Sequence, residues 1–172
     1  MTARKAAGEA TQNVLVVGIG NPDCGDDGIG ALVLRDLRGQ VPAGTTLAAR
    51  TGDVLDLIED WVGYEAVILV DAAMGNAGPG HIHRTDLLND TLPASLARAS
   101  THAFGVGEAI GLARPLGFLP NRVIIYAIEG ANFDPGAAMS PKVIEAARIL
   151  VGRVIAEALT MFDNPADARA EA

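Results

Sequence analysis

The sequence predicts a single three-layer α/β domain, in which a largely parallel twisted sheet is flanked by helices on both faces. Three short apolar runs rich in β-branched residues, Val14–Ile19, Ala66–Val70 and Arg122–Ile128, have the composition of strands buried on both faces. Segments with helical spacing of apolar residues separate these runs, and strands that alternate with helices form parallel sheets. A length of 172 residues suits one domain with one core.

The domain is expected to span residues 13–161. Residues 1–12 and 162–172 are polar and alanine-rich and lack a sustained apolar periodicity, so we expect a flexible tail at each end. The first strand, Val14–Ile19, leads into a glycine-rich turn. A helix should follow over residues 27–37, with Asp26 as its N-cap.

The middle of the chain repeats this alternation. We expect a strand over Thr45–Arg50 and then a helix over Val54–Trp61, which has its apolar residues on one side and Asp53 as its cap. The apolar strand Ala66–Val70 should end directly at Asp71.

The last third of the chain predicts an edge strand over His81–Thr85 and a glycine-rich helix over residues 106–114. The pattern over residues 86–100 is ambiguous between helix, strand and loop. After the third apolar strand, a long helix should begin at Pro141 and run past Leu159, with Ser140 as its cap.

Composition excludes several classes of protein. Hydrophobic residues make up 49% of the chain and the formal net charge is −8, so this is a globular protein without the basic face of a nucleic-acid binder. The single cysteine, Cys24, excludes a disulfide framework or a cysteine-rich zinc site within the chain. The first residues lack a signal peptide's apolar stretch, and no apolar run is long enough for a membrane helix. We therefore expect a cytoplasmic protein.

Acidic and imidazole side chains follow the predicted strands, where an open α/β sheet binds its ligands. Asp26 and Asp27 come after the first strand, Asp71 ends another, and His102 lies in a later loop. Asp71 is the most indicative, because a carboxylate at the end of an apolar strand is costly to desolvate unless it is paired or binds metal. The acidic pair could simply favour a helix N-terminus, and His102 alone could be a packed or surface histidine. Together, these carboxylates and the imidazole would suit nickel or zinc.

Other motifs are weaker. The pair Gly18 and Gly20 resembles a dinucleotide-binding loop, but Asp23 stands where the third glycine belongs. There is no Gly-x-Ser-x-Gly elbow and no P-loop. Cys24 is interpreted as an incidental turn residue.

Two histidines and a glutamate complete the polar candidates. His81 and His83 project to the same face of a short strand and are interpreted as a solvated edge. Glu129 ends the third apolar strand, where it could accept backbone hydrogen bonds near the site.

Four ordered blocks of sequence share the pattern of one known family. Residues 17–30 read Val-Gly-Ile-Gly-Asn-Pro-Asp-Cys-Gly-Asp-Asp-Gly-Ile-Gly and are similar to the family's opening signature. The other three blocks follow in the family's order: Leu69–Ala73 with Pro79–Gly80, Ser100–His102, and Ile124–Glu129 with Met139–Pro141. In these blocks the chain resembles the hydrogenase maturation proteases, the endopeptidases that act on the C-terminus of hydrogenase large subunits. The resemblance covers roughly residues 13–160.

The resemblance implies an enzyme that removes the C-terminal extension from a nickel-loaded [NiFe] hydrogenase large-subunit precursor. It also implies a catalytic and metal-binding site composed of Asp27, Asp71 and His102. The nickel would belong to the precursor, with another divalent metal as the alternative occupant. The activity would be of the aspartic endopeptidase type and would activate the hydrogenase. The precursor would be the partner of a monomeric protease, with no nucleic acid or membrane involved.

One segment departs from the family pattern. Many members carry an Asp-Gly-Gly-Thr-like segment where this chain has Ala49–Asp53, and Asp53 is the candidate replacement for the missing aspartate. Two other functions stay open, a non-catalytic nickel-binding module for hydrogenase assembly and a nucleotide-binding α/β protein. The acidic residues of the first turn count against the second, because they would repel phosphate.

Overall fold

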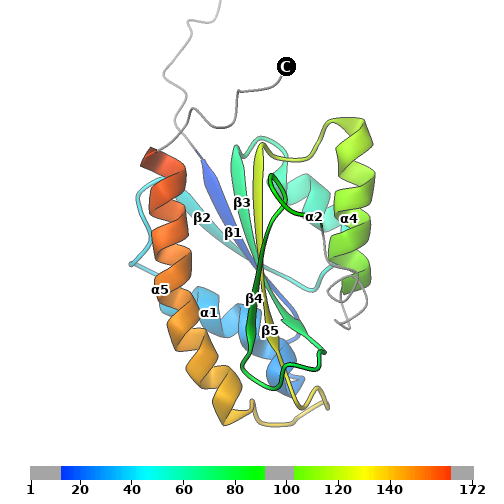
Figure 1. The fold of residues 1–172 in the computed structure, drawn as a ribbon, viewed down its shortest axis with the longest axis vertical. Coiled ribbons are helices and arrows are strands. Elements are labelled where there is room, and N and C mark those ends of the chain that lie inside the picture. The colour runs from blue at the N-terminus through cyan, green and yellow to red at the C-terminus, as the bar shows by residue number, and fades with distance from the viewer. Residues whose placement is uncertain (1–12, 92–102, 164–172) are drawn as a thin grey trace, which may run out of the picture.

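The computed structural model describes residues 13–91 and 103–163. Its sheet has five strands in the order β2-β1-β3-β5-β4 (Figure 1). All neighbouring strands are parallel except β4, which pairs with β5 in the antiparallel direction. The strands span Val14–Ile19 (β1), Thr45–Arg50 (β2), Ala66–Ala73 (β3), Ile82–Asp86 (β4) and Arg122–Glu129 (β5).

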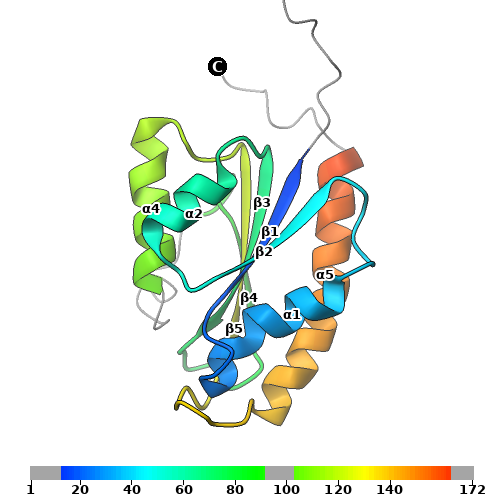
Figure 2. The same ribbon diagram turned by 180° about the vertical axis from the view of Figure 1, so that it is seen from behind.

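Helices cover both faces of this sheet. The described residues form a 3-10 helix and four α-helices, at Gly25–Gly28 (η1), Ile29–Leu37 (α1), Val54–Trp61 (α2), Ala103–Leu116 (α4) and Pro141–Asp163 (α5). Figures 1 and 2 show α1 and α5 on one face and α2 and α4 on the other. The predicted three-layer α/β architecture is therefore confirmed. None of the described helices is long and apolar enough to cross a membrane.

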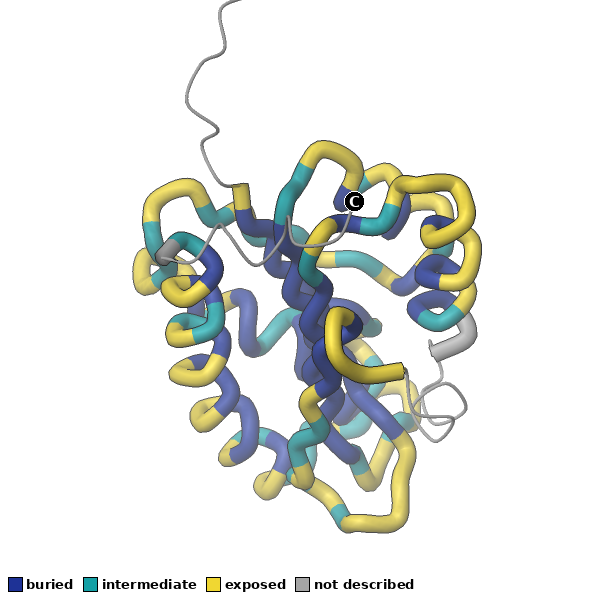
Figure 3. Tube along the Cα trace, turned by 45° about the horizontal axis from the view of Figure 1, so that its top comes forward, coloured by how far each residue is buried: buried dark blue, intermediate teal, exposed yellow. Residues whose placement is uncertain are grey.

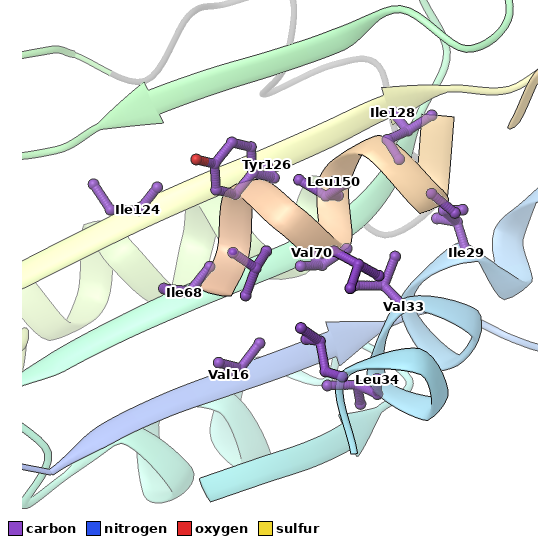
Figure 4. Packing of buried hydrophobic residues seen from close by; sticks show 14 of the residues in the cluster. Val16, Ile29, Val33, Leu34, Ile68, Val70, Ile124, Tyr126, Ile128 and Leu150 are labelled. Atoms are coloured by element: carbon purple, nitrogen blue, oxygen red, sulfur yellow. The ribbon is translucent and has the colours of Figure 1, made fainter. Parts of the chain in front are cut away.

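The core has two halves because residues of the strands alternate between the faces of the sheet. Val16, Ile68 and Ile124 face α1 and α5, where they pack with Leu34 and Leu150 (Figure 4). Their sequence neighbours face α2 and α4 and pack around Trp61, which is fully buried. Each large side chain buried in this way stabilises the fold by about 1.5–3 kcal/mol. The central strands are buried throughout (Figure 3), as continuous apolar runs predict.

Two glycines bring α1 into direct contact with the end of β1. A Cβ atom added to Gly30 would lie 2.5 Å from both the nitrogen and the oxygen of Ile19. A Cβ atom added to Gly18 would lie 2.5 Å from the carbonyl oxygen of Gly30. These glycines of the opening signature therefore have a packing role, and they position the turn that follows β1.

The structure corrects some predicted boundaries. Asp26 does not cap α1, because a turn of 3-10 helix intervenes and neither η1 nor α1 has a side-chain N-cap. Strand β3 does not end at Asp71 but continues to Ala73, because it pairs with β5 through Glu129. Ser140 precedes α5 as predicted, but its hydroxyl donates to Asp26. The predicted N-terminal tail, residues 1–12, lies outside the described residues. The same holds for residues 164–172 of the predicted C-terminal tail.

Candidate active site at the carboxyl edge of the sheet

Three aspartates are buried at the carboxyl edge of the parallel strands. Asp26 and Asp27 lie in η1, which follows β1, and Asp71 lies near the end of β3. Their relative exposures are 0%, 4% and 4%. Because η1 packs against β3, the segment that carries the acidic pair lies beside the strand that carries Asp71.

Asp27 is fixed by the turn after β1. Its Oδ2 accepts a hydrogen bond of 2.8 Å from the backbone nitrogen of Asn21. Gly20, with a φ of 126°, has no room for a side chain, because a Cβ atom there would collide with the carbonyl oxygen of Asp27. The Gly-Asn step of the signature thus holds the Asp27 carboxylate in place.

Asp71 lies inside the sheet, in register with Ala127 of β5. Because side chains alternate along a strand, Asp71 faces the α2 and α4 side, as Leu69 does. Its Oδ1 accepts a hydrogen bond of 2.8 Å from the backbone nitrogen of Ala72. The structure therefore holds a buried carboxylate beside the apolar side chains that pack under α2 and α4.

Asp26 has a different role, since its carboxylate binds the loop between β5 and α5. It accepts hydrogen bonds from the backbone nitrogens of Ala131 (2.7 Å), Asn132 (3.0 Å) and Ser140 (2.6 Å), and from the Ser140 hydroxyl (2.8 Å). Burial pushes the pKa of Asp26 upward, but these hydrogen bonds outweigh it and hold the pKa below its ordinary value. Asp26 therefore joins two loops of the carboxyl edge.

The third predicted site residue, His102, lies outside the described residues. Helix α4 begins at the next position, and Gly105 in its first turn packs against the carbonyl oxygen of Gly52, just after β2. The chain therefore enters α4 at the same edge of the sheet as Asp27 and Asp71. Within residues 13–91 and 103–163, no group of three His, Cys, Asp or Glu residues could hold a metal ion.

A further polar pair lies on β4 and β5. A ring nitrogen of His83, Nε2, lies 2.7 Å from Oε1 of Glu129. His83 is on an edge strand and 32% exposed, as interpreted from the sequence, but it also has this partner, which the sequence did not indicate. The other carboxylate oxygen of Glu129 accepts a hydrogen bond of 2.8 Å from Gly78, which confirms the predicted backbone contact. Burial raises the pKa of Glu129, but the His83 and Gly78 hydrogen bonds outweigh it, and the pKa lies below its ordinary value.

Sequence comparison decides the family. The family model for hydrogenase maturation proteases matches residues 44–157. The chain belongs to this family. It is accordingly a processing endopeptidase, and the resemblance seen in the sequence is confirmed.

Solved structures of maturation proteases share the fold. The hydrogenase maturating endopeptidase HybD from E. coli is 19% identical, with a TM-score of 0.71 over 86% of this chain and 93% of its own. An endopeptidase from Escherichia coli is 22% identical, with a TM-score of 0.74 over 86% and 91%. The hydrogenase 2 maturation peptidase from Thaumarchaeota archaeon SCGC_AB-539-E09 is 29% identical, with a TM-score of 0.62 over 87% and 99%. No curated protein matches the chain in sequence.

The segment that departs from the family pattern has a structural explanation in this protease. Asp53 caps α2, since its Oδ1 accepts hydrogen bonds from the backbone nitrogens of Leu55 (2.9 Å) and Asp56 (3.3 Å). The predicted cap is confirmed. Asp53 was also the candidate replacement for the aspartate of the family pattern, and its carboxylate is engaged in these capping hydrogen bonds.

Proposed function

We propose that this maturation protease removes the C-terminal extension of a nickel-loaded [NiFe] hydrogenase large-subunit precursor, and that Asp27, Asp71 and His102 engage the nickel. The observation that carries the proposal is the burial of two carboxylates, Asp27 and Asp71, on adjacent segments at one edge of the sheet. The family match supplies the reaction class, which is cleavage of a peptide bond.

The chemistry of the donors supports a metal partner. An ionised carboxylate is costly to bury, and a divalent cation offsets that cost by attraction and by accepting lone pairs. Two carboxylates and one imidazole suit a borderline ion such as nickel, and another divalent metal could occupy the same position. Three protein ligands leave coordination positions open for groups from the precursor.

Two mechanisms fit this arrangement. In one, the nickel of the substrate polarises the scissile carbonyl or activates the attacking water. In the other, the nickel only positions the bond, and one of the two aspartates acts as the general base. In both, a precursor without nickel would lack the group that Asp27 and Asp71 engage. We further propose that the protease works as a monomer in the cytoplasm, with the precursor as its partner.

The test is an endopeptidase assay on purified precursor in the nickel-loaded and nickel-free forms, with the mass of the large subunit as the readout. We expect loss of a C-terminal peptide from the loaded form only. Asp27→Asn and Asp71→Asn should each lower the rate by at least about 100-fold. Asp23→Asn should cleave at the wild-type rate, because Asp23 is exposed in the same turn.

Each outcome separates one part of the proposal from another. Equal cleavage of both precursor forms would refute nickel recognition while leaving the endopeptidase role intact. Binding of the loaded precursor without cleavage would favour the non-catalytic assembly module. Wild-type rates for well-folded Asp27→Asn and Asp71→Asn would remove both carboxylates from the site.

A further inference from the structure

His83 and Glu129 form a second polar centre at the carboxyl edge of the sheet. The Glu129 side chain is 3% exposed, whereas that of His83 is 32% exposed. The carboxylate therefore lies beneath the imidazole and holds it through the 2.7 Å contact at Nε2. The other ring nitrogen, Nδ1, has no hydrogen-bond partner among the residues that the structure describes.

The strand register places this histidine in the same row as Asp71. His83 pairs with Ala127 on β5, and Ala127 pairs with Asp71 on β3. Residues in register point to the same face of a sheet, so only the methyl group of Ala127 separates the two functional side chains in that row. Two strand spacings put the α-carbons about 10 Å apart, a distance that a water or metal ion together with a peptide group can bridge.

The environment of His83 suits proton transfer. A buried carboxylate that bonds one ring nitrogen fixes the tautomer and orientation of an imidazole and leaves the other nitrogen to react. The described groups that face the ring are Glu129 from β5 and His81 from β4 itself, whose ring centroid is 4.6 Å away. Asp71 lies two strands away on β3, and no described cation pairs with Glu129 apart from His83 when it is protonated.

A purely structural role is the competing explanation. Glu129 also binds the nitrogen of Gly78, and Gly75 approaches its carboxylate so closely that a side chain would collide with it. The glutamate thus anchors the loop between β3 and β4. That role requires the carboxylate but not an imidazole, because two backbone contacts and the strand pairing already hold the loop.

We propose that His83 is a further catalytic residue of the endopeptidase, the general acid that protonates the leaving amine, and that Glu129 is its positioning residue. The inference rests on the proposed function. A water oxygen bonds to the scissile carbonyl carbon while the general base takes a proton from that water. As the C–N bond breaks, Nδ1–H of the His83 imidazolium gives its proton to the departing nitrogen. The large subunit is left with a C-terminal carboxyl group, the general base releases its proton to solvent, and the neutral imidazole regains one from solvent.

The experiment compares His83→Gln with wild type and with His81→Gln, using nickel-loaded precursor between pH 5.5 and 8.5, with separate measurement of kcat and KM. Glutamine can still donate a hydrogen bond to Glu129 but cannot transfer a proton near neutral pH. We expect kcat of His83→Gln to fall by about 100-fold with little change in KM. The proposal also predicts that wild-type kcat declines as the pH rises and that His83→Gln shows no such decline. His81→Gln should keep both the wild-type kcat and that decline.

The structural alternative predicts the opposite pattern. If His83 only covers Glu129, His83→Gln should keep kcat and its pH profile, and that result would overturn the proposal. A Tm of His83→Gln near that of wild type excludes misfolding, and His83→Asn provides a second variant if the first is destabilised. Wild-type cleavage in the same assay tests the proposed function independently. If wild type does not cleave, both proposals fall, whereas an unaffected His83→Gln rejects only the role of His83.

Discussion

At the scale of single residues, the two members of the acidic pair have different functions although they are adjacent. Asp26 uses both carboxylate oxygens for protein hydrogen bonds that cross more than 100 residues of sequence. Asp27 accepts a local bond from Asn21 and lies beside β3. The first residue of the pair therefore holds the edge of the sheet together, and the second is the candidate ligand.

Asp26→Asn should destabilise the protease strongly. The substitution replaces one carboxylate oxygen by an amide NH2 group, which can donate but cannot accept hydrogen bonds. Either Ser140 or the backbone nitrogens at Ala131 and Asn132 then lose their acceptor. These hydrogen bonds are part-buried, and a donor left there without an acceptor costs about 1–3 kcal/mol, so we expect the free energy of unfolding to fall by about 3 kcal/mol. Urea denaturation measures this. Asp134 is exposed in the same loop, and Asp134→Asn should change the free energy of unfolding by less than about 0.5 kcal/mol. Equal losses for the two variants would contradict the stabilising role of the Asp26 hydrogen bonds.

At the scale of elements, the amino-terminal turn of α4 decides how the chain reaches the candidate site. Gly105 lies against the carbonyl oxygen of Gly52, so helix and loop touch through their backbones. Gly111, two turns later in the same helix, has open space where a side chain would be. The helix therefore excludes a side chain at Gly105 but has room for one at Gly111.

Gly105→Ala and Gly111→Ala form a matched pair. Gly105→Ala must push α4 away from the loop after β2, at a cost of about 1–3 kcal/mol, and should also reduce cleavage of the precursor, because His102 precedes this turn. Gly111→Ala should gain up to about 1 kcal/mol from helix propensity and leave cleavage unchanged. Thermal unfolding and the precursor assay measure both. Gains in stability for both variants would show that α4 does not depend on this contact.

Elements were predictable where local pattern decides them. The strand Val14–Ile19 and the helix Val54–Trp61 with its Asp53 cap follow from apolar runs, helical spacing and capping chemistry, and the structure has them with those bounds. Long-range contacts were not predictable. The sequence around Asp26 does not show that its carboxylate accepts hydrogen bonds from Ser140. The sequence around His83 does not show that its partner is Glu129, which lies 46 residues away. The strand register that joins them exists only in the folded sheet.

At the scale of the whole molecule, three separate carboxylates make the fold sensitive to acid: those of Asp26 and Glu129, which are buried, and that of Glu157, which is 11% exposed. Burial raises the pKa of Glu157, but hydrogen bonds from Arg84 and Tyr126 outweigh it and lower the pKa, as other contacts do for Asp26 and Glu129. Glu157 joins α5 to β4 and β5, and Asp26 joins the turn after β1 to the loop after β5. Glu129 joins β5 to β4. Each link needs the ionised form of its carboxylate.

The pH dependence of stability follows from the sign of these shifts. A carboxylate whose pKa is lower in the folded than in the unfolded state stabilises the fold above the unfolded value of about 4. That contribution is lost as the pH falls from there through the folded value. A net charge of −8 acts in the opposite direction, because acid relieves self-repulsion as the pH approaches the pI of 4.7. Salt screens the repulsion between surface charges more than it screens these partly buried links, so the links should dominate.

We therefore expect the urea midpoint to be lower at pH 3.5 than at pH 6 in 0.15 M salt. Asp26→Asn should reduce the difference between the two midpoints, because it removes one of the groups whose protonation destabilises the fold. Arg35→Gln, which breaks an exposed ion pair with Asp36, should leave the difference unchanged. A urea midpoint that is higher at pH 3.5 than at pH 6 would mean that relief of charge repulsion outweighs the loss of all three carboxylate links.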